Sequence, residues 1–400
     1  MRPDDLTTPA YVYDLAVVRD NHAALRAALP VPSRLYYSLK ANPHPAIVAE
    51  LARQGAEVCS TGELAAALSA GVPPERMLYT GPGRRTDELA EAVKAGVTWF
   101  SADSPHALDQ LDRVAAGLGA TVDVLLRVND KVPAAGQGLT MTGVASQFGA
   151  DAEWVEAEPE RFRSRPHARI GGFHLYMGSN IDGVDALAAQ FATAIGTAHR
   201  LHGLLGGELR LLNLGGGFGA PFGRHGERAA LDGLAALVEP RLDAAFPGWR
   251  HEEPLVAFES GRYLTATAGR LYTRVLDVKT SHGTPVVVLE SGINHLGGMS
   301  GLRRLPPLVP DLVAETDGHA DGLTTAIVAG PLCTPLDTWA RAANLPAVRP
   351  GDLLCVPNVG AYGLTASLLA FLGHPAPSEV VVDGDRVVAA SRLCIVRESI

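Results

Sequence analysis

Residues 34–72 read RLYYSLKANPHPAIVAELARQGAEVCSTGELAAALSAGV. Two short apolar runs, LYYSL (35–39) and EVCS (57–60), alternate with two segments of helical periodicity, PAIVAELARQG and GELAAALSAG. A strand, a helix and a second strand in this order form a βα unit, in which the strands pair in parallel. The stretch therefore predicts two consecutive βα units of a parallel sheet.

The same alternation continues along the chain. Six further strand-like runs are MLYT (77–80), TWFS (98–101), VDVLLRV (122–128), IGGFHLY (170–176), RLLNL (210–214) and LVAFE (255–259). Helical segments such as DELAEAVKAG and DALAAQFATAIGTAHRL lie between them, several of them closed by a glycine. Eight strands fit a (β/α)₈ barrel better than a doubly wound sheet, which has about six strands. We expect this α/β barrel over residues 30–270.

The last third of the chain changes character. LYTRVLDVKT, TPVVVLE, TTAIVAG, DLLCVP and SEVVVDGDRVVAASRLCIV are strand-like, and the last contains an Asp-Gly hairpin signal. This pattern predicts a C-terminal all-β domain over residues 271–400. The run AYVYDL (10–15) also reads as a strand, and we expect the segment 1–29 to join the C-terminal domain.

Composition excludes several classes of protein. The 400 residues are 47% hydrophobic with a formal net charge of −9, which is typical of a globular protein that does not bind nucleic acid. No apolar run approaches the ~20 residues of a membrane span, and the N-terminus lacks a signal-peptide core, so we expect a cytoplasmic protein. The four cysteines show no zinc-binding spacing, so we expect neither a metal site nor disulfides.

Four unusual features follow or end predicted strands. Lys40 follows the first run, His174 lies in the sixth, GGGFG (215–219) follows the seventh, and Glu259 ends the eighth. Singly, each has an ordinary explanation: a solvated charge, a buried core histidine, a turn or a surface ion pair. In a βα barrel, however, the carboxyl ends of all strands meet at one rim, where active sites lie. We therefore expect the four features to converge on one site.

Their chemistry suits pyridoxal phosphate. A lysine amine can form a Schiff base with a carbonyl, the bond that anchors this cofactor. Glycines that lead into a helix leave backbone N–H groups free to hold a phosphate. A carboxylate such as that of Glu259 would keep the pyridine nitrogen protonated, and the flat imidazole of His174 could stack on the ring. The residues thus predict a pyridoxal phosphate site.

Seven motifs together resemble the fold-type III pyridoxal phosphate decarboxylases, the group that contains diaminopimelate and ornithine decarboxylases. They are YYSLKAN (36–42), EVCSTGELAAALSAGV (57–72), FHLYMGS (173–179), LNLGGGFG (212–219), ESGRYL (259–264), GPLCTPLD (330–337) and NVGAYG (358–363). They occur in the order seen in the family and extend over most of the chain. The resemblance implies an alanine-racemase-like barrel followed by a β domain.

The resemblance also implies roles for individual residues. Lys40 would hold the cofactor, His174 would stack on it and Glu259 would face the ring nitrogen. Cys333 would enter from a partner subunit and protonate the carbanion, so the enzyme would be a homodimer with shared active sites. The residues expected around the cofactor phosphate are Ser179, Gly216, Gly217, Arg262 and Tyr362, and Gly261 is also expected to bind the cofactor.

The motifs depart from diaminopimelate decarboxylases in ways that concern the substrate. Those enzymes carry an acidic residue directly after the cysteine, where this chain has Thr334. They also carry an Arg-Pro motif ending in Tyr, whereas residues 297–310 offer Arg303 and Arg304 without that arrangement. The chain looks closer to a subgroup from antibiotic biosynthesis that decarboxylates glutamyl, aspartyl or 3-methylaspartyl groups tethered to an acyl carrier protein. We expect Thr334, Asp337, Arg303 and Arg304 near the substrate, with the two arginines as candidates for binding the acidic carrier.

Alternatives remain open from the sequence. The substrate could instead be a free amino acid of the diaminopimelate, lysine or ornithine type, or a siderophore intermediate. A racemase shares the lysine-bearing barrel, but Glu259 favours a fully developed carbanion and hence decarboxylation. A non-catalytic regulator would be expected to have lost Lys40, Glu259 or Cys333, and all three are present. A phosphosugar enzyme would explain the glycine loop but not the β-rich tail.

Overall fold

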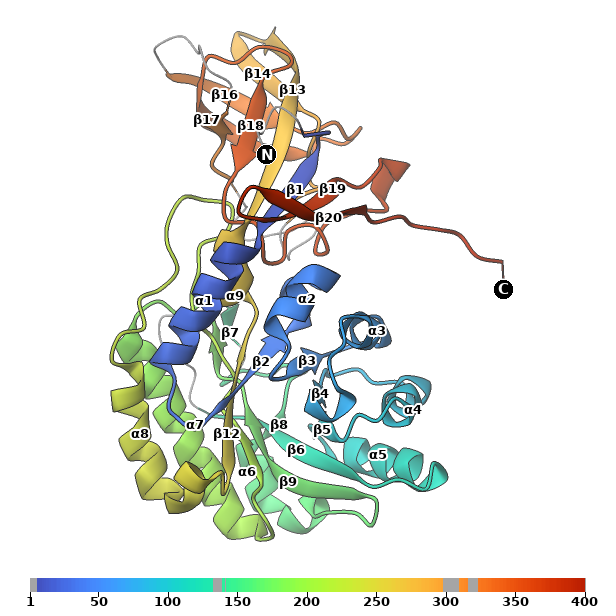
Figure 1. Cartoon of the computed structure of the whole chain (residues 1–400), viewed down its shortest axis with the longest axis vertical. Coiled ribbons are helices and arrows are strands. Elements are labelled where there is room, and N and C mark those ends of the chain that lie inside the picture. Colours follow the sequence, from blue (N-terminus) through green and yellow to red (C-terminus); the bar gives the residue numbers. More distant parts are fainter. Residues whose placement is uncertain (1–5, 132–138, 141, 298–308, 316–322, 400) are drawn as a thin grey trace. The chain divides into compact units, whose positions relative to one another are not determined.

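The computed structural model describes residues 6–131, 139–140, 142–297, 309–315 and 323–399 (Figure 1). The chain divides into two compact units. One, the barrel unit, spans residues 20–219 and 229–263, and the other, the β unit, spans residues 1–19, 220–228 and 264–400. Each unit is therefore assembled from segments that are distant in the sequence.

Among the described residues, eight parallel strands close the barrel, which confirms the predicted fold class. Each strand pairs in parallel with the next along the chain, and the last pairs with the first. The strands are β2 (Arg34–Ser38), β3 (Ala56–Val58), β4 (Met77–Tyr79), β5 (Trp99–Ala102), β6 (Val122–Asn129), β9 (Ala168–Leu175), β11 (Leu211–Asn213) and β12 (Leu255–Ser260). All eight coincide with the apolar runs read from the sequence.

Helices lie outside the barrel strands, as Figure 1 shows for α3, α4 and α5 beside β3 to β6. Local sequence sets their ends: the Ser60 hydroxyl accepts a hydrogen bond from Glu63 N–H at the start of α3, and Gly71 and Gly96 adopt positive φ just beyond α3 and α4. The helices are α1 (Leu15–Ala28), α2 (Pro45–Leu51), α3 (Thr61–Ser69), α4 (Thr86–Lys94), α5 (Pro105–Gly117), α6 (Ala152–Ala157), α7 (Val184–Leu205), α8 (Leu234–Ala245) and α9 (Arg262–Thr265).

A cluster of buried side chains from five strands fills part of the barrel interior. It consists of Tyr36, Leu78, Leu125, Leu211 and Ala257, in keeping with the packed core of (β/α)₈ barrels. Three two-residue strands, β7 (Leu139–Thr140), β8 (Ala150–Asp151) and β10 (Gly178–Ser179), lie outside the ring, and β7 pairs with β10.

The β unit is built on one sheet with the strand order β17-β16-β14-β13-β1-β19-β20, and β18 pairs with both β13 and β15. The first strand, β1, is antiparallel to β13 on one side and parallel to β19 on the other. The strands are β1 (Ala10–Asp14), β13 (Gly269–Ser281), β14 (Thr284–Leu289), β15 (Val313–Ala314), β16 (Leu323–Ala329), β17 (Thr338–Pro346), β18 (Leu353–Val356), β19 (Ser378–Asp383) and β20 (Arg386–Arg392).

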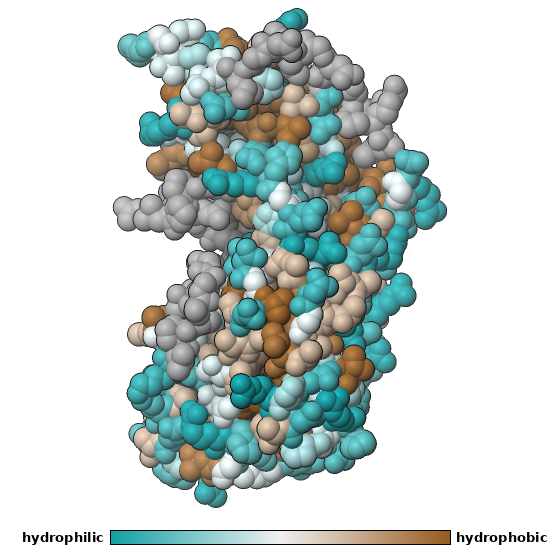
Figure 2. Space-filling view, turned by 90° about the vertical axis from the view of Figure 1, so that its left-hand side faces the viewer, coloured by the Kyte–Doolittle hydropathy of each residue, from teal (hydrophilic) through white to brown (hydrophobic). Residues whose placement is uncertain are grey.

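On the face shown in Figure 2, hydrophilic side chains surround small hydrophobic patches.

Within the part of the chain that the structure describes, no helix combines the length and apolar character needed to cross a bilayer. The four cysteines, Cys59, Cys333, Cys355 and Cys394, are all free thiols.

Candidate active site

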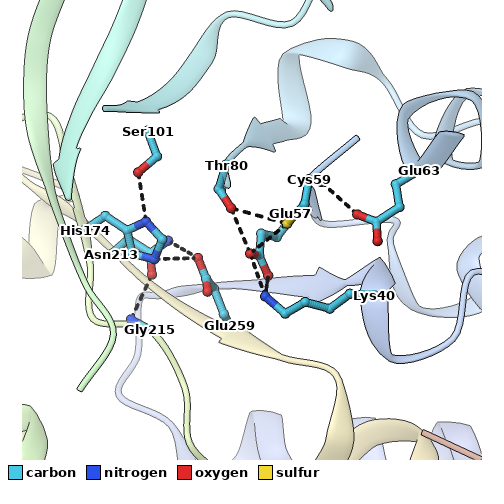
Figure 3. Close-up of polar contacts among 10 residues, drawn as sticks. All are labelled: Lys40, Glu57, Cys59, Glu63, Thr80, Ser101, His174, Asn213, Gly215 and Glu259. Carbon is cyan, nitrogen blue, oxygen red and sulfur yellow. Dashed lines mark hydrogen bonds and ion pairs between the residues drawn. The ribbon is translucent and has the colours of Figure 1, made fainter. Parts of the chain in front are cut away.

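Lys40 stands at the barrel rim and is paired with a buried carboxylate. It lies in a 3₁₀ turn, Leu39–Ala41, directly after β2. Its Nζ is 2.9 Å from Oε1 and 3.1 Å from Oε2 of Glu57, which lies on the neighbouring strand β3 opposite Ser38. The Lys40 side chain is 40% exposed and that of Glu57 only 2%. The amine is therefore accessible, while its position is set from within the barrel (Figure 3).

Glu57 is held in its ionised form. Burial alone would raise the pKa of its carboxyl, but the Lys40 ammonium and a hydrogen bond from Ser38 outweigh burial and lower the pKa to about 2. The Thr80 hydroxyl donates a further hydrogen bond of 3.0 Å to Oε1. A carboxylate that stays charged over the whole physiological range keeps the lysine amine directed toward it.

A thiol and a second carboxyl lie beside this pair. Cys59 Sγ is 3.6 Å from Glu57 Oε1 and 3.4 Å from Thr80 Oγ1. Burial, reinforced by the Glu57 charge, raises the pKa of the Cys59 thiol to about 12, so this thiol stays protonated and is a poor nucleophile. Glu63 accepts a 2.7 Å hydrogen bond from Cys59 N–H. This bond lowers the pKa of Glu63, but burial outweighs it and raises the pKa to about 6.

His174 and Glu259 form the other half of the site (Figure 3). His174, at the end of β9, has Nδ1 3.1 Å from the Ser101 hydroxyl of β5 and Nε2 3.1 Å from Glu259 Oε1 of β12. The Asn213 amide on β11 donates a 2.7 Å hydrogen bond to the same Oε1. Glu259 is 1% exposed, and its other oxygen, Oε2, has no hydrogen-bond partner among the described residues.

The glycine loop after β11 is locked to its surroundings by close packing. The Asn213 side chain accepts a 2.9 Å hydrogen bond from Gly215 N–H, and Gln190 of α7 donates one of 2.9 Å to the Gly216 carbonyl. A Cβ at Gly216 would lie 2.1 Å from the Glu259 carbonyl oxygen. Only glycine allows the loop and the end of β12 to approach this closely.

Other predicted site residues of the barrel unit lie next to this loop or to Lys40. Ser179 is in β10, whose Gly178 carbonyl would be 2.7 Å from a Cβ at Gly217. Gly261 follows β12, and a Cβ there would lie 2.6 Å from the Cβ of Ala41, the residue after Lys40. Arg262 begins α9.

The remaining predicted site residues belong to the β unit or lie outside the described residues. Cys333 is exposed in the loop 330–337, and Thr334 follows it. Asp337 closes the loop and is buried. Tyr362 adopts a positive φ of 57° in the NVGAYG segment. Arg303 and Arg304, predicted near the substrate, lie outside the described residues.

Sequence reasoning missed three residues of the barrel site: Glu57, Ser101 and Asn213. A signal for Glu57 was available, because an acidic residue in an otherwise apolar strand of a closed barrel requires a partner. Asn213 stands two residues before the glycine loop and could have been assigned to that loop. Ser101 offered no signal, since a serine at a strand end is common.

The barrel site fits pyridoxal phosphate. The protonated ring nitrogen of pyridoxal phosphate requires a buried acceptor, and Glu259 Oε2 is one. The carbonyl of the cofactor requires an accessible amine, which Lys40 offers. The phosphate requires backbone that a ligand can approach closely, and the glycine loop supplies it. The imidazole of His174 is fixed by Ser101 and Glu259, as a flat face for stacking requires.

Comparisons with known proteins agree with this geometry. Residues 15–266 match the family model described as pyridoxal-dependent decarboxylase, pyridoxal binding domain. An L-glutamyl-[BtrI acyl-carrier protein] decarboxylase from Niallia circulans is 34% identical over 386 residues, covering 94% of this chain and 88% of the relative. A 2-[(L-alanin-3-ylcarbamoyl)methyl]-2-hydroxybutanedioate decarboxylase from Staphylococcus aureus is 30% identical over 381 residues, 92% of each chain.

A solved structure shares the fold over nearly the whole chain. Diaminopimelate decarboxylase from Helicobacter pylori, complexed with L-lysine, matches with a TM-score of 0.82 at 26% identity and covers 96% of this chain and 94% of that one. The family model covers more than half of this chain and the curated relatives cover most of it. The chain therefore belongs to the fold-type III pyridoxal-dependent decarboxylases and is an enzyme that uses pyridoxal phosphate.

Proposed function

We propose that this decarboxylase acts on an acidic aminoacyl group, aspartyl, 3-methylaspartyl or glutamyl, whose side-chain carboxyl is tethered as a thioester to an acyl carrier protein. Loss of the α-carboxylate then gives an ω-amino acyl product that stays on the carrier. The observation that carries the proposal is the 34% identity, over 94% of this chain, to a decarboxylase named for a carrier-bound glutamyl group.

The loop 330–337 supports this substrate class. Thr334 stands where diaminopimelate decarboxylases place an acid, and its hydroxyl accepts a hydrogen bond of 3.3 Å from Leu336 N–H within the loop. Asp337 is the loop's one acidic residue, and both of its carboxylate oxygens accept backbone hydrogen bonds. The position after Cys333 therefore carries no charge for the distal ammonium group of diaminopimelate, lysine or ornithine, and the loop's one carboxylate is already bound by backbone donors. A thioester at that position needs no such partner.

The predicted site residues have separate tasks at the proposed cofactor site. Lys40 holds the cofactor through its amine, and Glu57 keeps that amine in place. His174 would stack on the ring and Glu259 would accept its N–H, while Ser179, Gly216, Gly217, Arg262 and Tyr362 would hold the phosphate and Gly261 would also bind the cofactor. Bound pyridoxal phosphate supplies an electron sink for the pair of electrons left when the α-carboxylate departs as CO₂. Cys333 would donate its thiol proton to the α-carbon, and the Lys40 amine would be the group that binds the cofactor again when the amine product leaves.

The same proposal includes the assembly. The enzyme is a homodimer in which Cys333 of one subunit completes the site of the other, as the family resemblance implies. The exposure of Cys333 on the single chain is compatible with this role. A cytoplasmic location stays a prediction.

A turnover assay tests the substrate. The holoenzyme is given an acyl carrier protein loaded with aspartate or glutamate through the side-chain carboxyl, and in parallel free aspartate, glutamate, diaminopimelate, lysine and ornithine. Mass spectrometry of the carrier should show loss of CO₂, whereas the free amino acids should release little. Lys40→Ala is the inactive control. Efficient turnover of a free amino acid with none of the carrier-bound forms would refute the proposal.

One further substrate is tested in the same assay. The Staphylococcus aureus relative, 30% identical over 92% of each chain, is named for an aminoacyl conjugate of a hydroxy-tricarboxylic acid. Like a thioester-tethered aminoacyl group, that compound carries no second ammonium group. If the enzyme decarboxylates this compound faster than the carrier-bound substrates, the decarboxylase activity stands but the proposed substrate is wrong.

A further inference from the structure

The loop that carries Cys333 is closed on itself by Asp337. At its neck, Gly330 N–H donates a 3.0 Å hydrogen bond to the Asp337 carbonyl. Inside the loop, Thr334 N–H donates to the Leu332 carbonyl at 2.7 Å, and Asp337 N–H donates to the Thr334 carbonyl at 3.2 Å. These bonds give residues 330–337 a compact shape, with Cys333 exposed at its surface.

The Asp337 carboxylate binds two different segments. Its Oδ2 accepts a 2.8 Å hydrogen bond from Leu332 N–H, directly before Cys333, and its Oδ1 accepts one of 2.8 Å from Ile293 N–H. Ile293 belongs to the segment 291–297, which is far from the loop in sequence. Asp337 is 2% exposed, so the two backbone donors have little competition from bulk water.

Two glycines make room for this carboxylate. A Cβ at Gly292 would lie 2.2 Å from Asp337 Oδ1, and a Cβ at Gly330 would lie 2.3 Å from Oδ2 and 2.4 Å from the Gly292 Cα. The two backbones therefore touch around the carboxylate. Such contact leaves no space for another residue at either glycine. The sequence predicts that Asp337 lies near the substrate, and in the single chain each of its carboxylate oxygens accepts a backbone hydrogen bond.

We propose that Asp337 is a positioning residue, which fixes the loop 330–337 to the segment 291–297 and thereby holds the Cys333 thiol in one orientation for proton donation. This inference rests on the proposed role of Cys333 as the proton donor. A carboxylate suits the task because both oxygens are acceptors. An asparagine has one acceptor oxygen and would turn its NH₂ group toward one of the two N–H donors.

The decisive variant is Asp337→Asn, which keeps the shape and removes one acceptor. Amide hydrogen exchange of the cofactor-free protein should become about five-fold faster in both the 330–337 and the 291–297 segments, the factor that corresponds to the loss of one ordinary hydrogen bond. In the holoenzyme, the fraction of turnovers that release an aldehyde in place of the amine should rise several-fold. If protonation at the α-carbon is delayed, the proton would go to the cofactor, water would supply the aldehyde oxygen, and the amino group would remain on the cofactor in its amine form. This fraction does not depend on how much of the protein is folded.

Two other variants complete the design. Asp352→Asn is the matched control, because Asp352 accepts a backbone hydrogen bond from Arg349 in another turn of the β unit; neither readout should change. Gly292→Ala leaves the carboxylate intact but forces a Cβ against Oδ1, and it should reproduce both effects. It decides the question if Asp337→Asn fails to fold.

Cys333→Ala separates the two claims. If it leaves the aldehyde fraction unchanged, the proposed donor role of Cys333 is wrong whatever Asp337 does. If Cys333→Ala raises the aldehyde fraction while Asp337→Asn and Gly292→Ala change neither that fraction nor the exchange rates, Asp337 does not position the thiol and the inference is overturned.

Discussion

At the scale of single residues, the defining feature is that the accessible Lys40 amine is paired with the buried Glu57 carboxylate. A charge pair with one buried member resists competition by water and salt better than a surface pair. Glu57 is therefore expected both to stabilise the fold and to orient the amine. Its effect on stability can be separated by pH, because only the ionised carboxylate contributes.

We expect Glu57→Gln to remove a pH-dependent part of the stability. The Glu57 pKa is lowered from 4.5 to about 2 in the folded protein, so its contribution is complete above about pH 4.5 and is lost as the pH falls toward 2. Between pH 6 and pH 3.5 the wild type should lose about 1 kcal/mol more unfolding free energy than the variant. Urea unfolding curves of both proteins at several pH values in this range measure the difference.

A surface carboxylate serves as the control for this prediction. Glu153 pairs with Lys131 where both side chains are exposed, and Glu153→Gln should leave the pH dependence close to that of the wild type. If the unfolding free energy of Glu57→Gln falls with pH as steeply as that of the wild type, the Glu57 carboxylate is not the cause of the pH-dependent stability.

At the scale of elements, the glycine loop after β11 and the end of β12 form one closely packed structure. The Asn213 amide joins them, since it donates to Glu259 and accepts from Gly215. The proposed contacts to the ring nitrogen and to the phosphate are therefore not independent. A substitution in the loop should therefore change the position of Glu259 as well.

Gly216→Ala tests this coupling. The new Cβ would lie 2.1 Å from the Glu259 carbonyl oxygen, so the loop and β12 must separate. We expect a loss of about 1–3 kcal/mol in unfolding free energy and weaker binding of pyridoxal phosphate to the cofactor-free enzyme, measured by denaturant unfolding and by absorbance titration. The matched control is Gly196→Ala in α7, where nothing lies within 4 Å; it should stabilise by up to about 1 kcal/mol. Equal effects of the two substitutions would contradict the coupling.

Elements differed in how well their sequences specified them. The eight barrel strands could be predicted because buried parallel strands are continuous apolar runs. The strand β17, TWARAANLP, could not, since its Ala, Arg and Asn residues have weak strand preference and it forms by pairing with β16. Lys40, His174 and Glu259 could be assigned to the rim from their strand positions. The partner of Lys40 could not, because it depends on the register that places Glu57 opposite Ser38.

At the scale of the whole molecule, the proposed dimer predicts complementation between inactive variants. Lys40→Ala lacks the cofactor lysine and Cys333→Ala lacks the proton donor, so each homodimer should form little of the amine product. In a mixed dimer one site receives both intact residues, because a two-fold interface exchanges the same residue in both directions. When equal amounts of the two variants have exchanged subunits, about half of the dimers are mixed, and the rate of amine formation should return to about a quarter of the wild-type rate.

Native mass spectrometry of differently tagged subunits checks that exchange has occurred. A mixture that contains mixed dimers but shows no recovered amine formation would mean that each site draws Cys333 from its own chain.

The position of β1 has a consequence for biosynthesis. Ala10 pairs with Tyr272 on one side and with Ser378 on the other, so this strand lacks both neighbours while the ribosome translates the intervening segments. At ordinary elongation rates, residue 378 follows residue 14 by roughly 20 to 70 s. During that interval an unpaired strand is open to association with other nascent chains. Premature termination before residue 378 would leave one edge of β1 permanently open, so truncated products of this chain should aggregate and depend on chaperones even when every barrel residue has been made.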